Sequence, residues 1–219
     1  MNNPIINLEN IKTNIAKECG RSDYVIEAVS KGQPLEKIAM LLEHGHRVFA
    51  ENKVQEAKLH WESIKPNYPH LKLHLIGALQ SNKIRPAVKL FDVIETVDSI
   101  ELAELIAKEA AKIGKIQEIM LQVNIGAEPQ KSGSATDELP ELVNFCKQNQ
   151  CLNLSGLMCI PPHNQQPEPY FAQMQKLQQQ FGLPYLSMGM SGDYVSAIKF
   201  GATHIRLGTA LFGERKIIA

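Results

Sequence analysis

Short apolar runs rich in β-branched residues alternate with amphipathic stretches, and this alternation restricts the fold more than any other feature of the chain. Eight such runs have the length and composition of buried strands. They cover residues 24–30, 46–50, 72–76, 93–96, 118–124, 154–160, 185–188 and 204–207. The stretches between them have apolar residues at helical spacing and cover residues 34–43, 54–63, 82–90, 100–112, 137–148, 169–181 and 192–200. A further helix is expected over residues 7–17, before the first strand.

This order of elements predicts the topology. Strands that alternate with helices pair in parallel, and right-handed crossovers place the helices outside the sheet. We predict an α/β fold: a single (β/α)8 TIM-type barrel with an extra N-terminal helix on its bottom or side and no second β domain, so that residues 1–219 are one domain. An open doubly wound sheet is the alternative. The turn after the first strand, Ser30-Lys31-Gly32-Gln33-Pro34, lacks the glycine pattern typical of that fold.

Composition excludes several classes of function. The 23 basic residues equal the 23 acidic ones, so the chain lacks the positive charge expected of a nucleic-acid-binding protein. No apolar stretch approaches the ~20 residues of a membrane helix. Residues 1–19 lack the continuous apolar region of a signal peptide, so we expect a cytoplasmic protein. The four cysteines form no Cys-x-x-Cys pair and are interpreted as structural thiols, and no metal site is predicted.

Lys31 stands where the catalytic end of the barrel is predicted. It directly follows the first strand, and active sites of β/α barrels lie at the carboxyl ends of the strands. An ammonium group is almost never buried without a partner. Desolvation lowers its pKa, and the neutral amine is the form that attacks a carbonyl. Position alone leaves open whether Lys31 is this nucleophile or a rim lysine that extends to solvent.

Polar residues follow the second and third strands as well. Asn52 follows the second strand, and it can cap the next helix while it also contacts a ligand. A polar turn around Gly77 follows the third strand, which contains His74. Turn chemistry alone can account for most of these residues. The other interpretation is that these polar residues form one wall of the site.

The ends of the last two strands predict a phosphate site. Ser191 follows the seventh strand, and Gly208 and Thr209 follow the eighth. Small and hydroxyl residues at such turns form nests of backbone N–H groups, and these two loops often bind phosphate in barrels. Barrel closure sets the first strand beside the eighth, so Lys31 should lie close to that phosphate. Such a pair suits a phosphorylated aldehyde, either a phosphorylated sugar or pyridoxal phosphate.

Seven segments then resemble one family, the pyridoxal phosphate homeostasis proteins, which are relatives of the barrel domain of alanine racemase. These segments are residues 28–31, 51–56, 74–83, 131–133, 155–158, 186–191 and 206–213. The resemblance implies that the chain binds pyridoxal 5′-phosphate in vitamin B6 homeostasis. It also implies that Lys31 holds the cofactor as an internal aldimine (a Schiff base), that Ser191, Gly208 and Thr209 bind its phosphate, and that Asn52 contacts it from the neighbouring rim.

The same resemblance assigns Arg206 to the pyridine nitrogen. A permanently charged guanidinium cannot keep that nitrogen protonated, so the ring becomes a weaker electron sink. The sequence departs from the family at Lys53, where Tyr or Arg is common, and at Gly192, which affects rim details only. Lys83 and Lys131 also match family positions; both are interpreted as solvated lysines, with transient contact to free cofactor left open.

Three functions are weighed on this basis. A non-catalytic carrier, with no catalytic residue, is preferred, and apo forms of pyridoxal phosphate-dependent enzymes are its expected recipients. An amino-acid racemase is the alternative, but alanine racemase takes one base from a Tyr of a second domain. Tyr24 and Tyr185 begin strands at the wrong end of the barrel, which leaves Tyr170 and Tyr194 as candidates. An enzyme acting on a phosphorylated sugar is disfavoured by the resemblance. A monomer is expected, because the racemase dimer uses that second domain.

Overall fold

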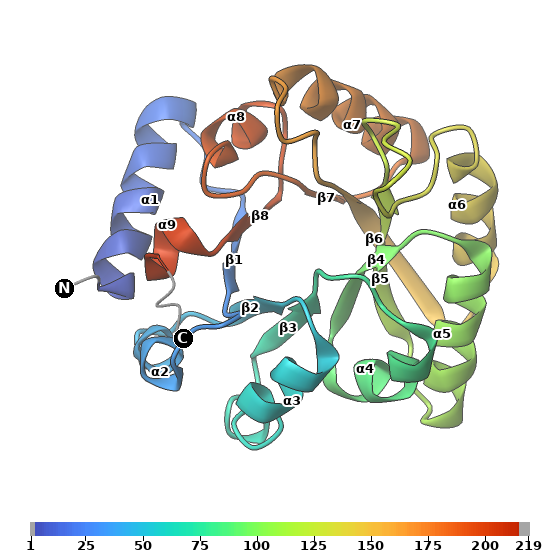
Figure 1. Cartoon of the computed structure of the whole chain (residues 1–219), viewed down its shortest axis with the longest axis horizontal. Helices are drawn as coiled ribbons and strands as arrows, with labels where there is room; N and C mark the ends of the chain where they lie inside the picture. Colours follow the sequence, from blue (N-terminus) through green and yellow to red (C-terminus); the bar gives the residue numbers. More distant parts are fainter. Residues whose placement is uncertain (1–2, 215–219) are drawn as a thin grey trace.

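The structure, a computed structural model, describes residues 3–214 and contains a closed barrel of parallel strands. Within these residues the strands pair in chain order, and the last pairs with the first (Figure 1). They are β1 (Val25–Val29), β2 (Val48–Glu51), β3 (Lys72–Leu75), β4 (Val93–Val97), β5 (Gln117–Val123), β6 (Leu152–Cys159), β7 (Tyr185–Ser187) and β8 (His204–Leu207). The predicted TIM-type barrel is confirmed, and every predicted strand is present.

Helices surround the barrel, as Figure 1 shows along its axis. The α-helices are α1 (Pro4–Cys19), α2 (Leu35–Glu43), α3 (Val54–Trp61), α4 (Ile84–Leu90), α5 (Ile100–Lys112), α6 (Leu139–Gln148), α7 (Glu168–Phe181), α8 (Tyr194–Lys199) and α9 (Thr209–Phe212). Two 3-10 helices, η1 (Lys65–Asn67) and η2 (Ser81–Lys83), precede β3 and α4. The main buried cluster fills the layer between these helices and the sheet.

The extra N-terminal helix covers the side of the barrel. The α1 helix packs on α2, α8 and α9, and the amide of Asn14 donates a hydrogen bond to the Tyr194 hydroxyl at 3.0 Å. Asn3 caps its start by accepting a hydrogen bond from the Ile5 amide at 2.9 Å. Gly20 ends it in the left-handed conformation that glycine adopts without strain. Of the two expected positions, bottom or side, the structure shows the side.

Three predicted helix starts can be compared with the structure. The helix predicted over residues 100–112 is α5, and Ser99 caps it by accepting a hydrogen bond from the Leu102 amide at its hydroxyl oxygen, at 3.2 Å. Pro34 lies one position earlier than predicted, at the N-cap of α2. Asn52 does not cap α3, because the N-cap is Lys53 and it has no side-chain capping bond. The capping interpretation of Asn52 was therefore wrong.

The barrel interior differs from the apolar outer layer. A small group of Val93, Met120 and Met158 is buried apart from the main cluster. Buried polar residues from β1, β3, β4, β7 and β8 occupy the remaining interior.

In the part of the chain that the structure describes, no helix is both long and apolar enough to cross a membrane. Burial raises the pKa of both the Cys146 and Cys159 thiols to about 12, as expected of structural thiols.

Candidate functional site at the carboxyl end of the barrel

Lys31 lies in a tight turn at the end of β1, and carboxylates bind the residues on both sides of it. The Ser30 hydroxyl donates to Glu51 Oε1 at 2.6 Å, and the Gly32 amide donates to the Glu56 carboxylate. The turn itself is closed by a bond from the Gln33 amide to the Ser30 carbonyl at 3.0 Å. Lys31 is half-buried, so part of its side chain reaches solvent. The backbone of Lys31 is thereby held from both sides.

Glu51 accepts several of the hydrogen bonds that hold this region, a role that was not predicted from the sequence. Its Oε1 atom also accepts hydrogen bonds from His60 Nδ1 at 2.9 Å and Trp61 Nε1 at 3.1 Å. The hydrogen bond to Glu51 raises the pKa of His60. The carboxylate is fully buried on the outer side of the sheet, against α3. A buried acid three positions before the start of a helix was the available signal, but its partners depend on the folded arrangement.

The end of β8 lies against the end of β1. Glu27 pairs with Arg206 and Ala28 with Leu207 in the ladder, and a Cβ added to Gly208 would lie 3.7 Å from the Val29 Cβ. Barrel closure thus places the turn after β8 beside the turn that carries Lys31. The juxtaposition of these two strand ends, expected from the sequence, is present.

Ser191 connects the loop after β7 to the start of α9. Its hydroxyl oxygen accepts a hydrogen bond from the Ala210 amide at 3.0 Å, which leaves the O–H free to donate to an anion. Thr209, the first residue of α9, is exposed, and Gly208 precedes it at the N-cap. The Ser191 and Thr209 hydroxyls, with the Thr209 amide at the helix start, are a donor set that fits a phosphate group.

Asn52 and Gly77 are packed together on the neighbouring part of the rim. A Cβ added to Gly77 would lie only 2.1 Å from the Asn52 carbonyl oxygen, so this approach requires glycine. Thr96 Oγ1 also donates to the Gly77 carbonyl at 2.9 Å. The turn after β3 therefore supports the backbone of Asn52 on the same rim as Lys31.

Arg206 is buried inside the barrel, and its guanidinium has a fixed direction. Nη1 donates to Ser187 Oγ at 2.7 Å, and Nη2 donates to the Cys159 carbonyl at 2.7 Å. Ser187 Oγ in turn donates to Glu95 Oε2 at 2.6 Å. Arg206 therefore belongs to an interior hydrogen-bonded chain that crosses from β8 to β4. Whether it also contacts a pyridine nitrogen stays a prediction.

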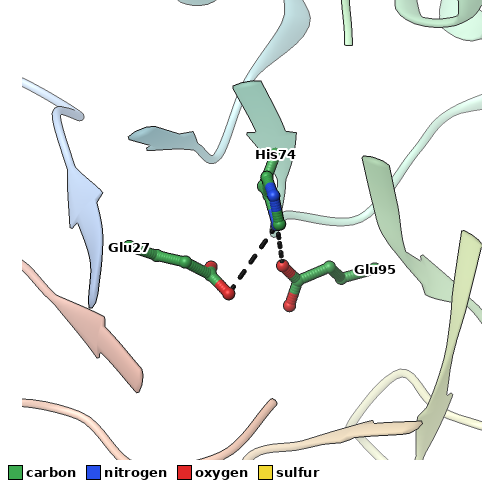
Figure 2. Close-up of side chains that lie close together, drawn as sticks. All are labelled: Glu27, His74 and Glu95. Carbon is green, nitrogen blue, oxygen red and sulfur yellow. Dashed lines mark hydrogen bonds and ion pairs between the residues drawn. The ribbon is translucent and has the colours of Figure 1, made fainter. Parts of the chain in front are cut away.

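Three further interior residues converge below this rim, and sequence reasoning singled out only His74 among them. Figure 2 shows Glu27 from β1, His74 from β3 and Glu95 from β4 pointing toward one another. His74 Nδ1 lies 2.6 Å from Glu95 Oε1 and 3.7 Å from Glu27 Oε1. An acidic residue at an inward position of an otherwise apolar strand was the signal that could have identified Glu27 and Glu95.

The two carboxyl groups have opposite electrostatic environments. Burial and the nearby charge of Glu95 raise the pKa of Glu27 well above its ordinary value. Burial also raises the pKa of Glu95, but the hydrogen bond and charge of His74, together with Arg206 and Ser187, outweigh it and lower that pKa to about 2. Glu95 is therefore held ionised, whereas the charged form of Glu27 is disfavoured.

Comparisons with known proteins agree with this architecture. Residues 6–216 match the family described as alanine racemase, N-terminal domain. A pyridoxal phosphate homeostasis protein of Aquifex aeolicus is 36% identical over 223 residues, which cover 95% of this chain and 97% of that protein.

Solved structures extend the likeness. PipY of Synechococcus elongatus, solved without PLP, has a TM-score of 0.86 and 37% identity and covers 94% of this chain and 98% of PipY. With PLP bound, PipY has a TM-score of 0.78 and 38% identity and covers 91% of this chain and 100% of PipY.

Proposed function

The chain belongs to the family of pyridoxal phosphate homeostasis proteins, and from this premise we propose that it binds pyridoxal 5′-phosphate and acts in vitamin B6 homeostasis. One structural observation carries the proposal for this chain. The β1 and β8 ends lie side by side, so an amine-bearing turn adjoins a donor set for phosphate. The amine-bearing turn suits the aldehyde of this cofactor, and the donor set suits its phosphate.

We assign the covalent attachment to Lys31. When bound, the cofactor supplies an aldehyde that condenses with an amine, with loss of water, and an electron-withdrawing ring. The Glu51 and Glu56 carboxylates fix the backbone on either side of Lys31, so little conformational freedom is lost when its amine is positioned. Ser191, Gly208 and Thr209 are assigned to the phosphate, and Asn52 to the neighbouring edge of the cofactor.

Arg206 is assigned to the ring nitrogen, and this supports a carrier without robust turnover. The guanidinium can only donate a hydrogen bond and cannot accept one from a protonated ring nitrogen, so the nitrogen is left unprotonated and the ring withdraws electrons less strongly than a protonated one. The Tyr194 hydroxyl, a candidate second base, is directed to Asn14 of α1 on the outside of the barrel. The Tyr170 hydroxyl donates to Gln165 in the loop after β6. These contacts favour holding and releasing the cofactor over racemisation.

A spectroscopic experiment tests the attachment. The purified protein, incubated with pyridoxal 5′-phosphate and freed of excess, should show a visible absorption band that Lys31→Ala loses. Lys83→Ala and Lys131→Ala are matched controls, because both residues lie on the rim loops, and they should keep the band. A wild-type protein that gains no band would overturn the proposal.

A second experiment separates the carrier from a racemase. The loaded protein is incubated with L-alanine or D-alanine in deuterated water, and exchange of the α-proton is followed by NMR. We expect no exchange at enzyme-like rates. Rapid exchange would contradict the carrier and favour the racemase.

It stays a prediction that the protein is a cytoplasmic monomer and that apo forms of pyridoxal phosphate-dependent enzymes receive the cofactor.

A further inference from the structure

The interior carboxyl group of Glu27 contacts His74 Nδ1 at 3.7 Å but lacks the hydrogen-bond partners that a buried polar group normally has. It is fully buried, and within residues 3–214 neither of its carboxylate oxygens has a hydrogen-bond partner. Buried carboxyl groups in folded proteins are almost always hydrogen-bonded, paired or bound to a metal. The guanidinium of Arg206, its neighbour in the ladder, is directed instead to Ser187 and the Cys159 carbonyl.

Glu27 is aimed at two other potential ligands. Figure 2 shows its carboxylate facing His74 and Glu95 across the barrel interior. One ligand atom from each of the three residues lies within 4.8 Å of the others. The ligand atoms of a tetrahedral zinc site are about 3.3 Å apart, given bonds of about 2.0 Å. His74 Nδ1 lies 3.7 Å from Glu27 Oε1 and 2.6 Å from Glu95 Oε1, and an ion between them would replace the His74–Glu95 hydrogen bond, with loss of its proton.

Ser187 orients the Glu95 carboxylate toward the other two candidate ligands. Ser187 Oγ donates to Glu95 Oε2 at 2.6 Å, which leaves Oε1 directed at the cluster. Hydrogen bonds of this kind orient the carboxylates that bind metals in proteins. The three ligands come from three strands of the barrel, so they are held on rigid elements.

We propose that Glu27, His74 and Glu95 bind one divalent transition-metal ion inside the barrel, beneath the cofactor site. One imidazole nitrogen and two carboxylates suit Zn²⁺ and Mn²⁺, and the general affinity order favours Zn²⁺. The ion would supply a partner for the buried Glu27 carboxyl group, whose oxygens have no hydrogen-bond partner among the described residues, and it would favour the charged form of that group. This site is independent of the proposed cofactor function, since none of its three ligands is assigned to pyridoxal phosphate.

Metal content is the direct test. The full-length chain is refolded with excess ZnCl₂ and without pyridoxal phosphate, and is then dialysed against metal-free buffer. Its zinc content is measured by inductively coupled plasma mass spectrometry. We expect wild type to retain about one Zn²⁺ per chain and Glu27→Gln and His74→Gln to retain less than about a tenth of that. Co²⁺ in place of Zn²⁺ should give a visible ligand-field band in wild type only.

A second cluster provides the matched control. Glu51, Glu56 and His60 also offer three ligand atoms within 4.8 Å, but Glu56 and His60 are only half-buried. Glu56→Gln should therefore retain zinc. Loss of zinc in Glu56→Gln with retention in Glu27→Gln would overturn the proposal, as would wild type without bound metal. If Glu27→Gln does not fold, thermal unfolding of wild type decides: Zn²⁺ should raise the melting temperature relative to EDTA, and equal values would contradict the site.

Discussion

Single residues set the position of Lys31. Ser30 and Gly32, its two neighbours, are bonded to Glu51 and Glu56, which lie in and after the adjacent strand. The identity of Lys31 as a candidate nucleophile follows from its place at a strand end, and the sequence is sufficient to find it. The bracing carboxylates could not be assigned from the sequence, because their contacts with Ser30 and Gly32 span more than 20 positions and exist only after the strands have paired.

Replacement of Ser30 tests this bracing. Ser30→Ala removes a buried hydrogen bond to a carboxylate, so we expect the free energy of unfolding to fall by roughly 1–3 kcal/mol. It should also weaken cofactor binding, because the turn that carries Lys31 loses a support. Urea unfolding and titration with pyridoxal phosphate measure the two effects.

Ser99→Ala is the control for that measurement. It removes the cap of α5 and should cost about 1 kcal/mol of stability, but Ser99 follows β4, which lies across the barrel from β1 and β8. Cofactor affinity should therefore be unchanged in Ser99→Ala. Equal losses of affinity in both variants would show that Ser30 acts only through global stability.

Two histidines, the buried His204 and the half-buried His46, predict a pH dependence of stability. Burial lowers the pKa of both His46 and His204 to about 4. The unfolded chain takes up a proton on each near pH 6.5, whereas the folded protein does not, so acid favours unfolding. This contribution is present above about pH 6.5 and is lost as the pH falls toward 4, by up to about 3 kcal/mol for each histidine.

The measurement compares urea unfolding of wild type and His204→Gln between pH 7 and pH 5. Other buried groups titrate in the same range, so only the difference between the two proteins isolates His204. The variant should lose less stability than wild type on acidification. His70→Gln, at an exposed position, should follow wild type. If His204→Gln loses as much stability as wild type between pH 7 and pH 5, the prediction is contradicted.

Whole elements were more predictable than their contacts. The eight strands and their order follow from apolar runs, and the boundaries of β8 and α5 agree with the predicted ranges. The four-residue helix α9 escaped prediction, because so short a segment shows no periodicity. Asn52 was misassigned as a cap because cap propensity is local, whereas α3 starts at Val54, as predicted, and its N-cap is therefore Lys53.

The contact between the β2 and β3 turns gives an element-level prediction. Gly77→Ala would place a Cβ 2.1 Å from the Asn52 carbonyl, so the two turns must separate. We expect a loss of about 1–3 kcal/mol in stability and weaker cofactor binding. Gly192→Ala is the matched control on the same rim, since nothing lies within 4 Å of its added Cβ. Its stability should change by less than about 0.5 kcal/mol. Equal stability of the two variants would contradict this packing.

At the scale of the whole molecule, closure of the barrel creates the site. Lys31 and Thr209 are 178 positions apart, and the pairing of β1 with β8 brings their strand ends together. The sequence predicted this closure from the count of strands. It could not predict the polar interior, since Glu27, His74, Glu95 and Arg206 meet only when inward positions of different strands face one another.

A ligand that binds only the folded barrel must raise its stability. At a free cofactor concentration 100 times the dissociation constant, the gain is about 2.7 kcal/mol. For a chain of this size, that corresponds to a rise of roughly 5–10 °C in melting temperature. Differential scanning fluorimetry with and without pyridoxal phosphate should show this rise in wild type and a much smaller one in Lys31→Ala. An equal rise in both proteins would exclude Lys31 as the attachment point.

The most direct test of the account is chemical trapping at Lys31. The loaded protein is reduced with borohydride, digested and mapped by mass spectrometry. The account predicts a stable pyridoxyl phosphate addition on the peptide that contains Lys31. An unmodified Lys31 peptide, with the addition on Lys83, Lys131 or no lysine at all, would contradict it.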